Sequence, residues 1–189
     1  MIDRLNRRIV IFEGPDRVGK STQINLLLKH LWQNFCLTPQ VIHFGHINGL
    51  SDVETKTYSY HLYNEMFSSW WFNKFPYIYD RSHIGEAVYG PLYRGYSADY
   101  IYELENEYRE NLSNVFLITL VNSPSELLLR EDGLSLKKDE EDPKRLKEIE
   151  INSFKKATSL SLIPNKKIIN CKGKTAEQVH KQVIKFIQS

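Results

Sequence analysis

A glycine-rich segment near the N-terminus constrains the fold of this chain more than any other feature. Residues 14–22 read Gly-Pro-Asp-Arg-Val-Gly-Lys-Ser-Thr, which fits the pattern G-x-x-x-x-G-K-[ST] in full. An apolar run at residues 9–12 precedes the segment, and isoleucine and leucine at helical spacing follow it. This order of strand, glycine loop and helix directs main-chain N–H groups and a helix N-terminus at one point. The segment therefore predicts a phosphate-binding loop.

The side chains of this loop suit a nucleoside triphosphate with its metal ion. Lys20 is expected to reach the β- and γ-phosphates, and the Ser21 hydroxyl to bind Mg²⁺. Arg17 lies inside the loop, where a guanidinium can stabilise charge on the transferring phosphoryl group. We therefore expect ATP and Mg²⁺ as ligands. The residues expected to bind ATP here are Gly14, Asp16, Arg17, Val18, Gly19, Lys20, Ser21 and Thr22.

Composition sets the class of protein. A length of 189 residues suggests a single domain, residues 1–189, with a sizeable core. The formal net charge of +2 gives no general preference for polyanions, so no nucleic-acid partner is expected. No apolar stretch approaches the ~20 residues that cross a membrane. Cys36 and Cys171 fit no metal spacing and no C-x-x-C motif, so we expect free thiols in a cytoplasmic protein.

Short apolar runs alternate with longer helical patterns. The expected strands are residues 8–13, 40–44, 76–80, 115–121 and 166–170. The expected helices are residues 20–34, 53–73, 97–111, 123–130, 143–159 and 175–188. The alternation predicts an α/β fold, a three-layer α/β/α P-loop NTPase with a five-stranded parallel sheet. Since ligands in such folds bind beyond the C-terminal ends of the strands, the residues that follow each strand are the candidates for a site.

The third strand is expected to end in a charged pair, Asp80 and Arg81. A carboxylate opposite the phosphate loop can hold Mg²⁺, directly or through water. An arginine beside it can bind a second phosphate, one that does not belong to the donor, through paired hydrogen bonds. An ion pair within the dipeptide is disfavoured, because neighbouring side chains on an extended chain diverge.

Two further segments are expected to hold the acceptor. Residues 82–95 contain three glycines and a proline, which predict an irregular loop with a short helix. Residues 53–73 form an aromatic helix, and Tyr63, Phe67 and Trp70 share one of its faces. Core packing is the ordinary role of such a face, but a planar base also needs an aromatic ring to stack on. The acceptor candidates in these segments are Tyr63, Phe67, Trp70 or Trp71, Glu86, Tyr89 and Arg94.

The segment after the second strand contains two histidines three residues apart, His43 and His46. Residues three apart on a strand face opposite sides, and no carboxylate or cysteine completes a metal site, so zinc is not expected. Contact with the acceptor through Phe44 or Asn48 is the favoured role for this segment.

A polar stretch at residues 131–143 is expected to be a lid that closes over ATP and excludes water. Arg130 stands at its base, where it can contact donor phosphates or stack on adenine. The late loop at residues 170–175 follows the last strand and suits contact with the donor base.

Two of these motifs carry a family resemblance. Residues 12–23 resemble the F-E-G-x-D-R-x-G-K-S-T-Q signature of thymidylate kinases, in the type whose phosphate loop carries the catalytic arginine. Asp80-Arg81 resembles the D-R motif of the same enzymes. The resemblance implies that Asp16 contacts the 3′-hydroxyl of the acceptor sugar, Arg81 binds the acceptor phosphate, and Asp80 serves the Mg²⁺ shell. It also implies small nucleotides as partners and a possible homodimer.

The sequence departs from the family pattern at two places that concern the base. The loop after the second strand reads Phe-Gly-His-Ile-Asn-Gly and lacks the family's arginine. The aromatic helix has no Lys or Arg between Thr57 and Asn73, where the family has an arginine that bonds the thymine carbonyl. Both departures argue against thymine specificity. Residues 80–95 also resemble the thymidylate-kinase-like proteins of phages, which are divergent in substrate.

The function predicted from these residues is a deoxynucleoside monophosphate kinase, with Lys20, Arg17, Asp80 and Arg81 as its catalytic residues. The alternative is a deoxynucleoside kinase, which needs a carboxylate base for a neutral 5′-hydroxyl. That base is absent at the end of the second strand, although Glu86 or Asp52 could substitute. Further alternatives are a non-catalytic P-loop binding module and a kinase acting on nucleic acid.

Overall fold

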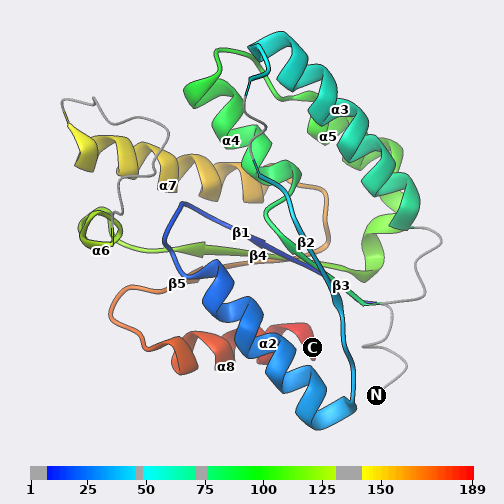
Figure 1. Ribbon diagram of the computed structural model, residues 1–189, viewed down its shortest axis with the longest axis vertical. Coiled ribbons are helices and arrows are strands. Elements are labelled where there is room, and N and C mark those ends of the chain that lie inside the picture. The colour runs from blue at the N-terminus through cyan, green and yellow to red at the C-terminus, as the bar shows by residue number, and fades with distance from the viewer. Residues whose placement is uncertain (1–7, 46–48, 71–75, 131–141) are drawn as a thin grey trace.

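The computed structural model describes residues 8–45, 49–70, 76–130 and 142–189 and is built around a five-stranded sheet (Figure 1). The strands are β1 (Ile9–Glu13), β2 (Gln40–His43), β3 (Tyr77–Asp80), β4 (Val115–Val121) and β5 (Asn165–Asn170). Their order in the sheet is β2-β3-β1-β4-β5, and every pairing is parallel. The predicted fold class is confirmed. β1, which leads into the glycine loop, lies at the centre of the sheet.

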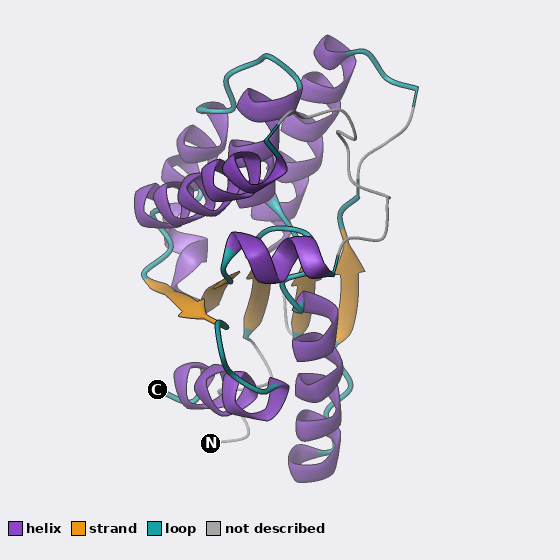
Figure 2. Cartoon of the chain, turned by 90° about the vertical axis from the view of Figure 1, so that its left-hand side faces the viewer, coloured by secondary structure: helices purple, strands orange, loops and turns teal. Residues whose placement is uncertain are grey.

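Helices cover both faces of the sheet, as Figures 1 and 2 show. One face carries α2 (Lys20–Phe35) and α8 (Ala176–Ile187), which pack against each other. The other face carries α3 (Asp52–Ser69), α4 (His83–Tyr93), α5 (Tyr100–Glu107) and α7 (Pro143–Leu160). The short helices α6 (Pro124–Leu129) and η2 (Arg109–Asn114) flank β4 in the sequence.

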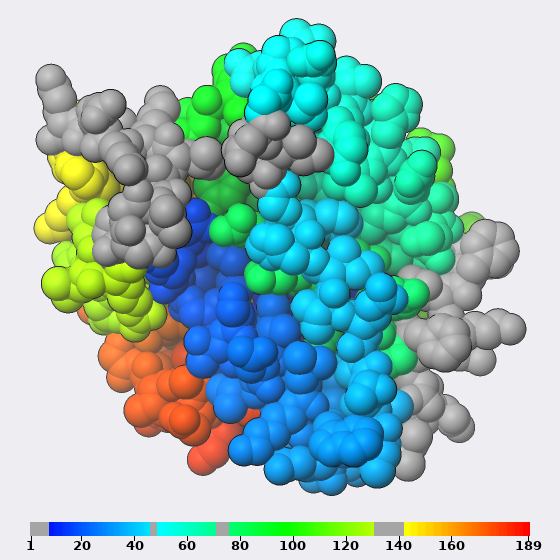
Figure 3. Space-filling model, viewed as in Figure 1, coloured from blue at the N-terminus to red at the C-terminus, as the bar shows by residue number. Residues whose placement is uncertain are grey.

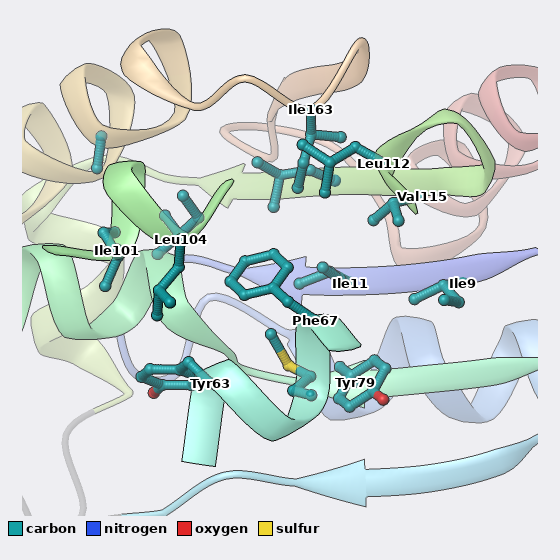
Figure 4. Close-up of a cluster of buried hydrophobic side chains, with 14 of the residues drawn as sticks. Ile9, Ile11, Tyr63, Phe67, Tyr79, Ile101, Leu104, Leu112, Val115 and Ile163 are labelled. Atoms are coloured by element: carbon teal, nitrogen blue, oxygen red, sulfur yellow. The ribbon is translucent and has the colours of Figure 1, made fainter. Parts of the chain in front are cut away.

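The central strands contribute alternate side chains to two cores. Ile9 and Ile11 of β1 belong to the core under α3, α4, α5 and α7, whereas Val10 and Phe12 belong to the core under α2 and α8. Successive side chains of a strand point to opposite faces, so a strand buried on both sides needs an unbroken apolar run. Figure 4 shows the first core, with Phe67 of α3 at its centre.

One segment is more regular than the sequence predicts. Residues 82–95 were expected to form a loop with a short helix, but α4 runs for 11 residues through Gly85, Gly90 and Pro91. Gly90 allows the chain that follows α4 to pack closely, because a Cβ there would lie 2.9 Å from the ring of Tyr96. Packing therefore favours glycine at position 90 of this helix.

Other element boundaries differ by a few residues. The helix expected at residues 97–111 is divided into α5 and the 3₁₀ helix η2. Trp71, Asn48 and residues 131–141 of the predicted lid lie outside the described residues. Cys36 is exposed, Cys171 is buried, and both are free thiols. Among the helices that the structure describes, none combines the length and apolar character of a membrane span.

Removal of the Phe67 side chain should strongly destabilise the fold. Phe67 is fully buried, and its ring lies 4.8 Å from that of Trp70 and 4.9 Å from that of His83. Phe67→Ala would leave a cavity and should lower the free energy of unfolding by about 3–5 kcal/mol in urea titrations. Val53→Ala on the same helix, where the side chain is 76% exposed, should change it by less than about 0.5 kcal/mol. Similar losses in both variants would contradict the placement of Phe67 in the core.

Candidate functional site: two pockets around the glycine loop

The glycine loop connects the central strand β1 to α2, and two positions in it require glycine. Gly14 has a φ of 132°, and a Cβ there would lie 2.1 Å from the carbonyl oxygen of Leu120 in β4. Gly19 has a φ of 103° and is the N-cap residue of α2. Both backbone conformations are left-handed and strained for any other residue. The loop is thereby held close to β4, with the N-terminus of a 16-residue helix at its end.

Lys20 extends back along this loop. Its Nζ donates hydrogen bonds to the carbonyl oxygens of Gly14, at 2.8 Å, and Pro15, at 2.9 Å. Burial, together with the nearby charge of Arg81, lowers the pKa of Lys20 to about 8. An anion bound beside the ammonium group would favour its charged form.

Two arginines near the loop have left-handed backbones, which few residues other than glycine adopt. Arg17 has a φ of 64° and Arg81 a φ of 70°. The turn at Arg81 is fixed by its own N–H group, which donates to the carbonyl oxygen of Phe12 in β1 at 3.0 Å. Such conformations cost about 1–3 kcal/mol each and concentrate at functional sites. This turn directs the Arg81 side chain to Asp16 of the glycine loop, with which it forms an ion pair.

The predicted metal ligands, Ser21 and Asp80, suit Mg²⁺. Asp80 lies at the end of β3, next to β1 in the sheet, and its Oδ2 lies 3.1 Å from His43 Nδ1. Its Oδ1 is buried and has no partner among the described residues. Ser21 is exposed in the first turn of α2. The described residues contain no group of three or more His, Cys, Asp or Glu side chains that could enclose a metal. A hydroxyl and a carboxylate nonetheless fit Mg²⁺ in phosphotransferases, where substrate phosphates and water complete the shell.

A buried carboxylate at the end of β1 caps the helix that follows Arg81. Glu13 is fully buried, and its Oε1 accepts hydrogen bonds from Ser82 N (2.7 Å), Ser82 Oγ (3.1 Å) and Gly85 N (3.1 Å). These N–H groups belong to the N-terminus of α4, which has no side-chain cap of its own. Burial raises the pKa of Glu13, although His83 and the two N–H groups oppose this. Glu13 thus connects the strand before the glycine loop to α4.

The polar contacts continue on the other side of α4. His83 Nδ1 lies 3.0 Å from Ser82 Oγ, and its Nε2 lies 2.7 Å from Glu105 Oε1 of α5. Both contacts of the His83 ring are shielded from solvent, since His83 and Glu105 are fully buried. Although burial raises the pKa of Glu105, the His83 hydrogen bond and charge hold it below its usual range. The N-terminus of α4 is therefore fixed from two sides by carboxylates.

One of the two pockets at the loop lies between α3 and α4, and we call it the α3–α4 pocket. Figure 3 shows the green β3–α4 segment exposed between the blue N-terminal segment and the cyan segment around β2 and α3. The residues that line the pocket are Asp16, Phe44, Gly45, Leu50, Thr55, Tyr58, Ser59, Leu62, Tyr63, Arg81, Ser82, Gly85, Glu86, Tyr89 and Arg94.

Most of the predicted acceptor-binding residues meet in this pocket. Phe44 packs edge-on against Tyr63, with ring centroids 5.9 Å apart. The Tyr89 hydroxyl has no partner among the described residues, and burial, with Asp16 nearby, raises its pKa so that it stays protonated. Glu86 and Arg94 form a nearly buried ion pair at 2.6 Å. Arg94 is therefore neutralised by Glu86 rather than offering an isolated charge to a phosphate.

Phe67 and Trp70 were predicted as acceptor candidates, but the structure places both in the core. Phe67 is fully buried, and Trp70 is 5% exposed and donates its indole N–H to Tyr79 Oη at 3.2 Å. Neither lines the α3–α4 pocket. The i, i+4, i+7 spacing correctly identifies one helical face. Of its three residues, Tyr63 lines the pocket, whereas Phe67 and Trp70 pack in the core. Helical spacing alone cannot show where along a helix the core ends.

A second pocket lies between α2 and the loop after β5, and we call it the α2–β5 pocket. Its lining residues are Val18, Gly19, Thr22, Gln23, Leu120, Arg130, Cys171, Lys174, Thr175, Ala176 and Val179. Arg130, predicted at the base of a lid, donates to the carbonyl oxygen of Arg17 at 3.3 Å. The loop of residues 170–175, predicted to contact the donor base, also borders this pocket. The glycine loop and the start of α2 therefore border both pockets, with Asp16 in the α3–α4 pocket and Val18 and Gly19 in the α2–β5 pocket.

Sequence reasoning missed three polar residues of this site. Glu13 is part of the signature at residues 12–23, but only the fold shows that its side chain is buried and contacts the N-terminus of α4. Thr55 and Ser59 were hidden by the aromatic residues around them. Their spacing of four residues on a predicted helix, one turn before Tyr63, is the signal that could have identified them.

Comparison with known proteins supports the fold. The sequence matches no protein-family model and no curated protein sequence. Among solved structures, thymidylate kinase from Ehrlichia chaffeensis superposes with a TM-score of 0.63 at 18% identity, over 97% of this chain and 100% of that one. The chain has the thymidylate kinase fold.

Two further structures share this thymidylate kinase fold. Thymidylate kinase from Candida albicans gives a TM-score of 0.61 at 18% identity, over 97% of this chain and 92% of that one. The YorR protein of Bacillus subtilis, solved in complex with phosphorylated GDP, gives 0.60 at 18% identity, over 95% of each chain. The likeness in fold thus extends over nearly the whole chain.

Loss of the Glu13 carboxylate should affect the ligand of the α3–α4 pocket more than the ligand of the glycine loop. Glu13→Ala leaves three donors at the α4 N-terminus without their acceptor and should displace Arg81 and the α4 residues of the α3–α4 pocket. We expect the KM of the ligand bound there to rise about tenfold, with little change for the ligand of the glycine loop. Glu13→Gln keeps one acceptor oxygen and should recover part of the loss.

Glu105→Ala is the matched control, because it removes a second buried carboxylate from the same helix N-terminus. It should lower the free energy of unfolding to a similar extent while it leaves the KM of the α3–α4 ligand nearly unchanged. If both variants shifted that KM equally, Glu13 would have only a general structural role.

Proposed function

We propose that this protein is an ATP-dependent deoxynucleoside monophosphate kinase. The observation that carries the proposal is the position of Arg81. Its guanidinium is held by a left-handed turn at the end of β3, opposite the glycine loop and in the wall of the α3–α4 pocket. A loop built for one polyphosphate thus faces a fixed cation suited to a second phosphate. The whole-chain likeness to thymidylate kinases supports the same assignment.

In this proposal, the ATP triphosphate lies on residues 14–21, with Lys20 at its β- and γ-phosphates and its base in the α2–β5 pocket. Ser21 and Asp80 would hold Mg²⁺, which when bound neutralises charge on the β- and γ-oxygens. The acceptor lies in the α3–α4 pocket, with its phosphate on Arg81 and its sugar near Asp16. Arg130, which contacts the loop carbonyl of Arg17, borders the donor side.

The reaction is an in-line transfer between the two pockets. An oxygen of the acceptor phosphate forms a bond to the γ-phosphorus of ATP, the bond from that phosphorus to the β,γ-bridging oxygen breaks, and ADP leaves. Lys20 and Arg17 stabilise the charge that spreads over the γ-oxygens, and Arg81 holds the attacking phosphate in line. No general base is needed, since the acceptor oxygen is already anionic.

The pairing of carboxylates favours a monophosphate acceptor over a nucleoside. A nucleoside 5′-hydroxyl would need a free carboxylate as its base. Among the described residues around the α3–α4 pocket, Asp16 pairs with Arg81, Glu86 pairs with Arg94, and Glu13 caps α4. Asp52, the other carboxylate considered, is exposed in the first turn of α3. Both carboxylates that line the α3–α4 pocket, Asp16 and Glu86, are therefore engaged in ion pairs.

A coupled assay of ADP release tests this function across nucleosides and their monophosphates with ATP and Mg²⁺. We expect turnover with deoxynucleoside monophosphates and its loss in Lys20→Ala, which removes the cation at the transferring group. Turnover with nucleosides alone would make the protein a deoxynucleoside kinase. ATP binding without turnover of any acceptor would make it a non-catalytic P-loop module.

Arg81→Ala separates the two substrates. Loss of charge-assisted hydrogen bonds to the acceptor phosphate should raise the acceptor KM about 10- to 100-fold. The KM for ATP should change far less, because Lys20 and the loop backbone remain. Steady-state kinetics with each substrate varied in turn measures both values, and equal effects on both would contradict the acceptor role of Arg81.

A further inference from the structure

The α3–α4 pocket has a phosphate end and a far end. Asp16 and Arg81 mark the phosphate end, and the Tyr63 hydroxyl nearby donates to the carbonyl oxygen of Ser82 at 3.2 Å. Ser59 and Thr55 lie one and two turns before Tyr63 on α3, about 6 and 12 Å along the helix axis. Both line the same pocket. A nucleotide with its phosphate on Arg81 therefore directs its base toward these two hydroxyls.

Two charged residues of the pocket, Glu86 and Arg94, form an ion pair with each other. Glu86 Oε2 accepts from Arg94 Nη1 at 2.6 Å, and Glu86 Oε1 accepts from the hydroxyls of Tyr96, at 2.5 Å, and Tyr100, at 3.3 Å. The Glu86 side chain is only 4% exposed. A guanidinium can only donate and a carboxylate can only accept, so these are the groups that would impose a fixed polarity on a base. Their mutual pairing leaves that task to the hydroxyls.

A hydroxyl does not impose a polarity. Thr55 is 5% exposed and its hydroxyl makes no hydrogen bond to another described residue, while Ser59 is 7% exposed and its hydroxyl is hydrogen-bonded to the Tyr100 phenol. The Thr55 hydroxyl can therefore rotate to donate or to accept. The exocyclic amino group of cytosine donates, whereas the carbonyl at the same position of thymine or uracil accepts. A rotating hydroxyl can bind either group.

We propose that Thr55 and Ser59 contact the acceptor base, and that the protein phosphorylates deoxynucleoside monophosphates with a keto or an amino group at the contacted position of the base with similar efficiency. The inference rests on the proposed function and extends it to the class of acceptor. A site with buried groups of fixed polarity rejects the wrong partner by factors of about 10⁴–10⁵, because a buried polar group is then left unpaired. Hydroxyls at the base end remove that penalty for both kinds of base.

The uracil and cytosine deoxynucleoside monophosphates form the test pair, because they differ only in the exocyclic group and the protonation of its neighbouring ring nitrogen. In the wild-type protein, we expect their kcat/KM values to agree within about tenfold. A preference of 10³-fold or more for either compound would overturn the inference and leave the proposed function standing. Absence of turnover with every monophosphate and nucleoside would refute both.

Two isosteric substitutions locate the contact. Thr55→Val removes one hydroxyl from the pocket and should lower kcat/KM about 2- to 10-fold for both compounds, through a higher KM. Thr57→Val makes the same chemical change two residues away, at an exposed position where the hydroxyl donates to Val53 O at 2.9 Å, and should change neither value. Equal kinetics in the wild type and Thr55→Val would contradict the role of Thr55. If only nucleosides are turned over, the ratio of deoxyuridine to deoxycytidine decides the inference separately from the proposed function.

Discussion

The hydrogen bonds from the α4 N-terminus to Glu13 hold the two halves of the site together. Glu13 ends the strand that leads into the glycine loop, and α4 carries Gly85, Glu86 and Tyr89 of the α3–α4 pocket. A carboxylate closed off from water stays in place only where several donors compensate its burial, as Ser82 and Gly85 do here. The position of the pocket wall relative to the phosphate loop is therefore set by a polar contact as well as by the apolar packing of α4 against β1.

Much of the fold could be predicted because it depends on patterns local to the sequence. The apolar run of β4 was placed at its observed bounds, residues 115–121, since a parallel strand buried on both faces admits few polar residues. The glycine loop was identified from spacing alone. Residues 82–95 were read as more irregular than they are, because the cap that supports α4 comes from Glu13, about 70 residues earlier, and no local pattern could reveal it.

The main cationic residues of the site could be predicted from the sequence, but the ion pairs between its side chains could not. Lys20 and Arg81 were assigned from motifs, and the structure places them on the loop and facing it. The sequence could not show that Arg94 is neutralised by Glu86 or that Asp16 is bound to Arg81, since these partners meet only in the folded chain. It also could not divide the aromatic face of α3 between pocket and core. These properties depend on tertiary distances, which periodicity does not contain.

The ion pair between Asp16 and Arg81 has a consequence for which molecules the pocket retains. A ligand that carries its own anion can replace the aspartate on the guanidinium, so one favourable contact is exchanged for another. An uncharged molecule of the same shape must separate the two charges without offering a substitute. In the proposed kinase, the ion pair would therefore disfavour binding of unphosphorylated nucleosides relative to their monophosphates, before any chemical step.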